Sequence, residues 1–278
     1  MQFPVQETIE KRRSIRSYEP KPLRAEDRDK LMAFAEAVNN PFGVPTRIGL
    51  IETEHADSPK KLGTYGVIRG AGSFLGIAVA KEPLGLEAAG YDMEQVVLYA
   101  THLGLGTCWL AGTLNREGFT RAMGTGEGEW MPAITPVGYP AQKLSFHEQL
   151  MRSSMKSTQR KPWRELFFHT DFRTALCEAD VGDYAPALEL LRLAPSATNA
   201  QPWRVVMDGS AFHFYAVVGK DALAENPPAI QRVDVGIGAC HFHLATQEKK
   251  LPGHFARLSD RVSSAPEGWR YLFSWVKG

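Results

Sequence analysis

The sequence contains 278 residues, of which 44% are hydrophobic and 23% are charged, and this composition is typical of a globular chain with a packed core. Its 32 basic and 31 acidic residues give a formal net charge of +1, so no general field attracts nucleic acid or an anionic membrane. Any anion site must therefore come from a local cluster of Lys and Arg. No apolar run approaches the roughly 18 residues that a membrane span needs. Because the N-terminal residues also lack the apolar core of a secretory signal, we expect a cytoplasmic protein.

The first 140 residues alternate between helical and strand-like patterns. Helices are predicted at 5–13, 25–38 and 92–102, the last of which ends at the glycine pair Gly104 and Gly106. Strands are predicted at 47–52, 74–80, 107–111 and 133–137, and the segment 39–45 is predicted to be a loop.

A polar segment at 143–164, rich in Ser, Lys and Arg, is predicted to connect two parts of the chain. Beyond it we expect a helix at 185–193, a loop at 195–202, strands at 204–208 and 212–218, and a helix at 234–248.

The second part repeats the order of elements of the first. Residues 37–47 align without gaps on residues 194–204, with Ala, Pro and Arg coinciding, and each segment follows a helix and precedes a strand. Ala100-Thr101 likewise matches Ala245-Thr246. Each match alone could arise by chance, but the common order favours a duplication. We therefore predict two related halves, 1–150 and 151–278, joined through 143–164.

Three guanidinium groups and a hydroxyl lie within five residues, at Arg12, Arg13, Ser14 and Arg16, where the first helix is expected to end. Arginine binds phosphate oxygens through two parallel hydrogen bonds, and a serine hydroxyl adds another. A solvated basic helix end would have the same composition, so both interpretations stay open on these residues alone.

The loop between Pro195 and Pro202 combines small residues with a hydroxyl and two amides, at Ser196, Asn199 and Gln201. Such groups can form hydrogen bonds with the edge of a planar heterocycle while the small side chains let the backbone approach its face. An ordinary turn is the alternative, although it would be unusually rich in these groups.

These motifs resemble the nitroreductase family. The resemblance is carried by RRSIRSY at 12–18, LGLGTCWLAG at 103–112, VGYP at 137–140, QRKPWRELF at 159–167 and LAPSATNAQPW at 193–203. The arrangement as two fused halves is similar to the family called putative TM nitroreductases. It implies an α+β fold of the FMN-dependent nitroreductase type, in which the two halves pack as an intramolecular pseudo-dimer around a shared helical interface.

In the ordinary nitroreductases that this chain resembles, each FMN takes its phosphate contacts from one subunit and part of its ring contacts from the other. Here the first half keeps the Arg cluster but has Phe42 where Asn199 aligns. The second half keeps the loop 195–202, called the ring loop below. It has an acidic stretch, 172–183, in place of the Arg cluster. The resemblance therefore implies one composite FMN site per chain.

The same resemblance implies which residues bind the cofactor. The phosphate and ribityl end would be held by Arg12, Arg13, Ser14 and Arg16, with Arg160 and Lys161 added from the basic segment. The isoalloxazine ring would lie against Pro195, Ser196, Ala197 and Asn199. Ala111 and Gly112 would lie near flavin N5, where a backbone N–H can stabilise charge on the reduced ring.

The function implied is an FMN-dependent oxidoreductase that uses NAD(P)H to reduce small electron-poor acceptors, such as nitroaromatics or quinones, as a monomer or loose homo-oligomer. Because the cofactor carries the redox chemistry, no catalytic side chain is required. Two alternatives stay open: a flavin-binding or degenerate protein without turnover, and another flavin reaction such as reductive dehalogenation or flavin fragmentation.

Other candidate motifs favour plain structural roles. The glycines at 124–128 lack the Lys-Ser/Thr of a phosphate loop and are interpreted as a turn. His241 and His243 would point to different faces of a helix, so no shared metal is expected, and both are interpreted as core or surface residues. The three scattered cysteines match no zinc or CxxC spacing.

Overall fold

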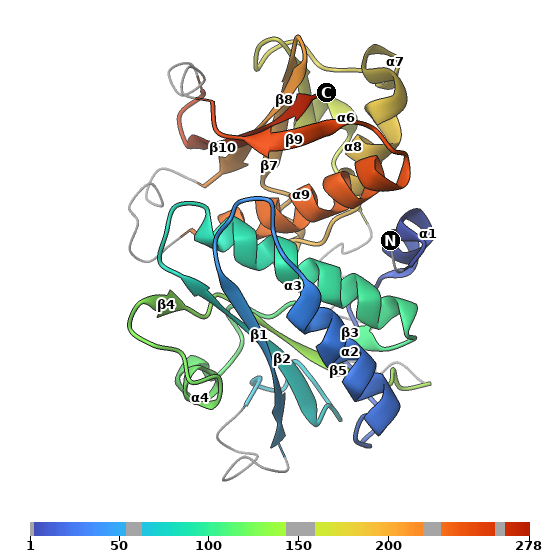
Figure 1. The fold of residues 1–278 in the computed structure, drawn as a ribbon, viewed down its shortest axis with the longest axis vertical. Helices are drawn as coiled ribbons and strands as arrows, with labels where there is room; N and C mark the ends of the chain where they lie inside the picture. The colour runs from blue at the N-terminus through green and yellow to red at the C-terminus, as the bar shows by residue number, and fades with distance from the viewer. Residues whose placement is uncertain (1–2, 54–62, 143–158, 219–228, 259–264) are drawn as a thin grey trace.

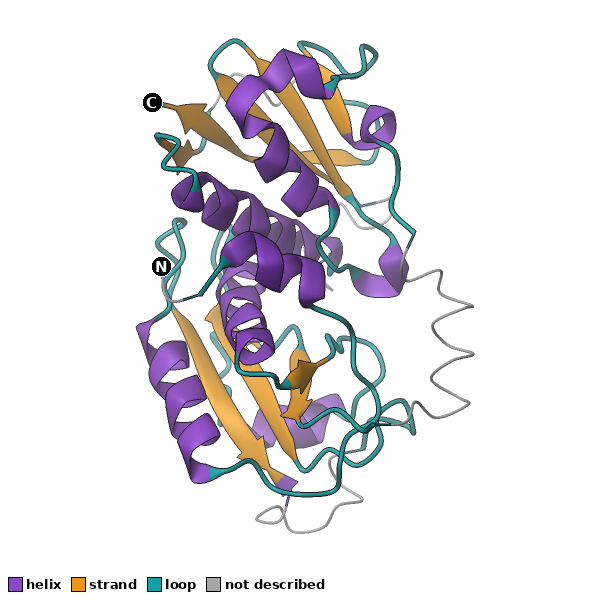
Figure 2. Ribbon diagram, turned by 90° about the vertical axis from the view of Figure 1, so that its right-hand side faces the viewer, coloured by secondary structure: helices purple, strands orange, loops and turns teal. Residues whose placement is uncertain are grey.

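Two β-sheets with a pair of long helices between them make up the fold of the computed structural model (Figures 1 and 2). The structure describes residues 3–53, 63–142, 159–218, 229–258 and 265–278. The predicted connection 143–164 lies largely outside these residues. The predicted boundary between the halves, at residue 150, also lies outside them.

In the first half, five strands form an antiparallel sheet of order β1-β2-β5-β3, with β4 paired to β2. The strands are β1 (Thr46–Glu52), β2 (Ser73–Ala80), β3 (Gly106–Thr107), β4 (Glu129–Trp130) and β5 (Ile134–Gly138). The helices are α1 (Val5–Lys11), α2 (Ala25–Ala37), α3 (Gly85–His102) and α4 (Arg116–Ala122).

In the second half, the sheet order is β6-β7-β8-β10-β9, with β6 parallel to β7 and the other pairs antiparallel. The strands are β6 (Phe167–His169), β7 (Trp203–Asp208), β8 (Ala211–Val217), β9 (Gly253–Ala256) and β10 (Trp269–Lys277). The helices are α6 (Trp163–Leu166), α7 (Glu178–Val181), α8 (Ala185–Arg192) and α9 (Gln231–Glu248), with 3₁₀ turns at Gly182–Tyr184 and Ala197–Asn199.

The two halves share one topology, which confirms the predicted duplication. The order β1-β2-β5-β3 corresponds to β7-β8-β10-β9, and an 18-residue helix, α3 or α9, follows the second strand of each set. Both helices end in the same way, with Leu105 N donating to Ala100 O and Leu251 N donating to Thr246 O. Ala100 therefore corresponds to Thr246, so the pairing of Ala100-Thr101 with Ala245-Thr246 is wrong by one residue.

Glycines let α3 and α9 cross in close contact between the sheets. A Cβ on Gly90 would lie 2.1 Å from the Val233 carbonyl oxygen, and one on Gly236 would lie 2.1 Å from that of Glu87. Beside this crossing, Arg232 donates to both carboxylate oxygens of the buried Glu87, at 2.6 and 2.8 Å. The two halves thus meet through the predicted helical interface.

Several element boundaries differ from the predictions. Helix α3 starts at Gly85 rather than at 92. Leu86, Glu87, Ala88 and Ala89 are good helix formers, and the helix tolerates Gly85 and Gly90 because both are buried where the packing is close. The strand predicted at 107–111 shortens to β3, with Leu110 forming only a single bridge to Ile134. No strand is predicted after residue 248, whereas β9 and β10 both lie there, and β10 is an inner strand between β8 and β9.

Candidate functional site

The Arg motif lies at the edge of the first sheet, directly after α1. The backbone leaves the helix at Arg12, and Ile15 N donates to the carbonyl oxygen of Thr107 in β3 at 2.8 Å. Arg12 and Arg16 are each only 7% exposed, whereas Arg13 is exposed and Ser14 is partly buried. A solvated helix end would leave all three guanidinium groups in water, so that interpretation fails for Arg12 and Arg16.

The predicted ring loop has a strained backbone. Thr198, Asn199 and Gln201 have φ values of 50°, 58° and 50°, in the left-handed region that non-glycine residues rarely adopt. Polar contacts hold this conformation, since Gln201 N donates to Ser196 Oγ at 2.9 Å and Gln201 Nε2 donates to Asn199 O at 3.2 Å. Strain that the surroundings maintain in this way is typical of binding loops and argues against an ordinary turn.

A buried acid at the start of α9 supports the same loop. Ala197 N lies 3.2 Å from both carboxylate oxygens of Asp234 and donates to them. Burial raises the pKa of Asp234 to about 8, although the hydrogen bond from Ala197 acts in the opposite direction. Asp234 has no motif around it in the sequence, so its role could be found only from the fold.

Arg160 connects the ring loop to the Arg motif. Its guanidinium donates to Asn199 Oδ1 at 3.2 Å and to Leu193 O at 3.0 Å. Burial, together with the positive charges of Arg12, Arg192 and Arg13, lowers the pKa of Arg160 to about 10. Arg12 of the first half and Asn199 of the second are almost 190 residues apart in the sequence. Both lie near the side chain of Arg160.

Lys161, the next residue, contacts the ring loop through its backbone. Its N–H donates to Gln201 Oε1 at 2.8 Å. Burial lowers the pKa of its ammonium group, and the charged neighbours that affect it are Arg204 and Glu165 rather than Arg12 or Arg13. The structure therefore does not bring the Lys161 charge to the Arg cluster.

Ala111 and Gly112 have no described contact with the Arg cluster or the ring loop. The Ala111 carbonyl accepts from the Arg116 guanidinium, and Gly112 is exposed, with nothing within 4 Å of the place where a Cβ would lie. Their assignment to the N5 edge of a flavin stays a prediction.

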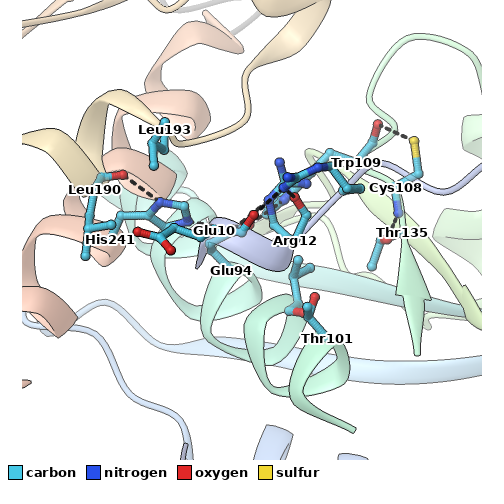
Figure 3. Close-up of polar contacts among 12 residues, drawn as sticks. Glu10, Arg12, Glu94, Thr101, Cys108, Trp109, Thr135, Leu190, Leu193 and His241 are labelled. Carbon is cyan, nitrogen blue, oxygen red and sulfur yellow. Dashed lines mark hydrogen bonds and ion pairs between the residues drawn. The ribbon is translucent and has the colours of Figure 1, made fainter. Parts of the chain in front are cut away.

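Glu94, which no sequence motif marks, lies near Arg12 (Figure 3). This fully buried carboxylate in α3 accepts from Trp109 Nε1 at 2.7 Å and lies 2.9 Å from His241 Nε2 and 3.9 Å from Arg12 Nε. Burial lowers the pKa of Arg12, and the charge of Glu94 partly opposes that effect. His241 is fully buried, in agreement with its interpretation as a core residue.

The charge balance of this cluster fits an anion. Arg192 pairs with Glu189 at 2.5 Å, yet the cations Arg12, Arg192 and Arg13 still lower the pKa of Arg160. In addition, Arg12 Nε is buried and forms no hydrogen bond with any described residue. A phosphate would supply an acceptor for this buried group.

In the corresponding loop of the first half, Phe42 packs against aromatic rings of other elements. The ring of Phe42 lies 4.8 Å from that of Phe273, 5.6 Å from that of Phe255 and 6.0 Å from that of Tyr91, measured between centroids. Where the second half has a polar loop, the first half has an aromatic contact with the opposite sheet.

A cavity of about 220 Å³ lies elsewhere, beside the start of α3, and is lined by residues of both halves that include Leu84, Trp130, Arg257 and Tyr271. None of the residues predicted to bind flavin lines it. Among the described residues, no helix has the length and apolar character that crossing a membrane would require.

The family model described as putative TM nitroreductase matches residues 4–246. A solved structure of a putative nitroreductase from Thermotoga maritima is 17% identical, with 100% of this chain and 95% of that chain covered and a TM-score of 0.64. This likeness confirms the α+β nitroreductase fold over both halves.

Two shorter proteins match about half of the chain. A nitroreductase family protein from Clostridium difficile is 20% identical, with 59% of this chain and 96% of that chain covered and a TM-score of 0.45. A nitroreductase with bound FMN from Bacteroides fragilis is 19% identical, with 52% and 92% covered and a TM-score of 0.42. A search of curated proteins found no match.

Proposed function

The chain belongs to the family described as putative TM nitroreductases, and on this premise we propose that it is an FMN-dependent oxidoreductase with one composite flavin site. The proposal rests chiefly on one observation. Arg160 lies among Arg12, Arg13 and Asn199, so the basic motif of the first half meets the polar loop of the second.

In this proposal the Arg cluster binds the flavin phosphate. Arg12, Arg13, Ser14, Arg16 and Arg160 form charge-assisted hydrogen bonds with its oxygens, which are stronger than those between neutral groups. The buried positions of Arg12 and Arg16 strengthen these contacts, because little water competes for the guanidinium groups.

The ring loop then orients the isoalloxazine. The Pro195–Asn199 segment presents Ser196, Ala197 and Asn199, and its strained backbone is fixed by Asp234 and Gln201 before any ligand arrives. Ala111 and Gly112 contribute backbone N–H groups at the reacting edge. Bound FMN would supply the hydride chemistry, with NAD(P)H as donor and a small electron-poor compound, such as a nitroaromatic or a quinone, as acceptor.

The test is flavin uptake by the purified protein. We expect about one FMN per chain, measured from the visible absorbance of the flavin after desalting, and bleaching of that absorbance by NADH or NADPH under anaerobic conditions. Protein that takes up no added FMN contradicts the proposal. Uptake without bleaching by either nucleotide would leave a flavin-binding protein and contradict the assigned activity.

The phosphate contacts are tested by replacing Arg12 and Arg13 together with Ala. We expect the dissociation constant of FMN to rise at least about a hundredfold, since each hydrogen bond to a charged group contributes about 1.5–3 kcal/mol. Arg121→Ala is a matched control, because it removes an exposed arginine of α4 that pairs only with Glu117 among described acids. Unchanged FMN affinity in the double variant would exclude these two arginines as phosphate ligands.

A further inference from the structure

His241 of α9 and Glu94 of α3 form a buried pair across the interface of the two halves. We infer that His241 holds Glu94 electrically neutralised, so that the charge of Arg12 stays available to a phosphate, which makes His241 a positioning and selectivity residue. The inference rests on the proposed flavin function and goes beyond it, since it explains how the site would prefer FMN over a flavin without phosphate.

The hydrogen bonds of His241 require a proton between it and Glu94. His241 Nδ1 lies 3.0 Å from the carbonyl oxygen of Leu190, which can only accept, so Nδ1 carries a hydrogen. His241 Nε2 lies 2.9 Å from Glu94 Oε1. Either Nε2 is also protonated and faces a carboxylate, or Nε2 is bare and faces a carboxylic acid. In both forms the pair holds one shared proton and has no net charge.

Without that proton, Glu94 would carry an uncompensated charge beside the Arg cluster. Its Oε1 atom lies 3.9 Å from Arg12 Nε, and both side chains are buried, so solvent would screen this charge little. The Trp109 indole N–H donates to the other oxygen at 2.7 Å but brings no formal charge. A charged Glu94 would therefore compete with a phosphate for Arg12.

A second buried pair across the same helices offers a matched control. Arg232 of α9 holds Glu87 of α3 in the same way that His241 holds Glu94. Glu87 lies seven residues before Glu94, about 10 Å along the helix axis. Glu87 and Arg232 have no described contact with the Arg cluster, so their loss should affect the stability of the interface rather than phosphate binding.

The experiment compares the affinities of FMN and riboflavin, which differ by the phosphate alone. In His241→Gln, the neutral amide leaves Glu94 charged, and we expect the preference for FMN over riboflavin to fall about tenfold, as a unit charge at this range would produce. In the double variant with Glu94→Gln, the charge is gone and the preference should return. Arg232→Gln should lower the melting temperature and leave the preference unchanged.

These outcomes separate the inference from a merely structural role. Equal loss of FMN and riboflavin binding in His241→Gln, or no recovery in the double variant, would overturn it while leaving the proposed function intact. If His241→Gln does not fold, the single variant Glu94→Gln serves as the test. Its preference for FMN over riboflavin should equal or exceed that of the unmodified protein. A lower preference contradicts the inference. Unmodified protein that binds neither flavin overturns both the inference and the proposed function.

Discussion

Burial distinguishes Arg12, Arg16 and Arg160 from the arginines of an ordinary basic surface. Arg12 and Arg16 retain 7% exposure each, and the pKa of Arg160 falls to about 10 through burial and neighbouring cations. Holding such groups together costs free energy unless an anion compensates them. Arg12, Arg13 and Arg16 are close in the chain, whereas Arg160 was expected to join them only because the segment 159–167 resembles the family's basic segment.

Asp234 provides a pH-dependent prediction at the scale of one residue. Its pKa in the folded protein is raised to about 8, whereas an unfolded chain has the ordinary value of about 3.9. The unfolded state therefore releases this proton first, and the free energy of unfolding should fall as the pH rises from about 4 to about 8. Urea unfolding at a series of pH values measures this slope.

The Asp234→Asn variant is the control for that slope. Asn keeps an oxygen that can accept from Ala197 N, but it has no proton to lose. We expect a flatter dependence in this interval and a variant at least as stable as the unmodified protein near pH 8. Parallel profiles for the two proteins would show that Asp234 is not the group that titrates.

At the scale of the elements, the close crossing of α3 and α9 depends on two glycines. In Gly90→Ala the new methyl group would meet the Val233 carbonyl at 2.1 Å, a contact with backbone that side-chain rotation cannot relieve. We expect a loss of about 1–3 kcal/mol in the free energy of unfolding, measured in urea, as for other overpacked cores. Gly128→Ala is the control, because nothing lies within 4 Å of its Cβ position, and an equal loss there would contradict the explanation.

How far the sequence predicts an element depends on whether its pattern is local. Helix α2 and strands β1 and β2 appear within a residue of their predicted bounds, because their apolar spacing and the flanking Pro and Gly are local signals. Strand β6 has three residues and exists because β7 offers a free edge for parallel pairing, so no local pattern marks it. The start of α3 differs for another reason, because Gly85 and Gly90 interrupt a stretch whose other residues, at 86–89, are good helix formers.

In the candidate site, too, the sequence reveals only features that are local in the chain. Its motifs were visible as short stretches of unusual composition, at 12–16 and 195–199. Glu94 and Asp234 were not, because their importance comes from the residues that the fold places against them. The structure brings Arg12, Arg13, Arg160 and Asn199 together but not Lys161, Ala111 or Gly112, and the binding role of every predicted site residue stays a prediction.

At the scale of the whole molecule, duplication has produced two halves with one topology and different contents. The loop of the second half is polar and strained, whereas the loop of the first half inserts Phe42 among aromatic rings of the opposite half. The same position therefore contributes to a proposed binding site in one half and to the interface in the other. A symmetric pair of sites is not compatible with this packing.

Phe42→Ala tests this asymmetry. Phe42 is only partly buried, so we expect a loss of about 1–3 kcal/mol in stability, less than the 3–5 kcal/mol typical of a buried phenylalanine. The flavin content should stay at about one per chain, because the space that opens has no cluster of arginines to bind a phosphate. Flavin absorbance, combined with the molar mass from light scattering, measures the ratio. A second equivalent of FMN in Phe42→Ala would mean that the aromatic side chain alone blocks a site whose phosphate ligands survive.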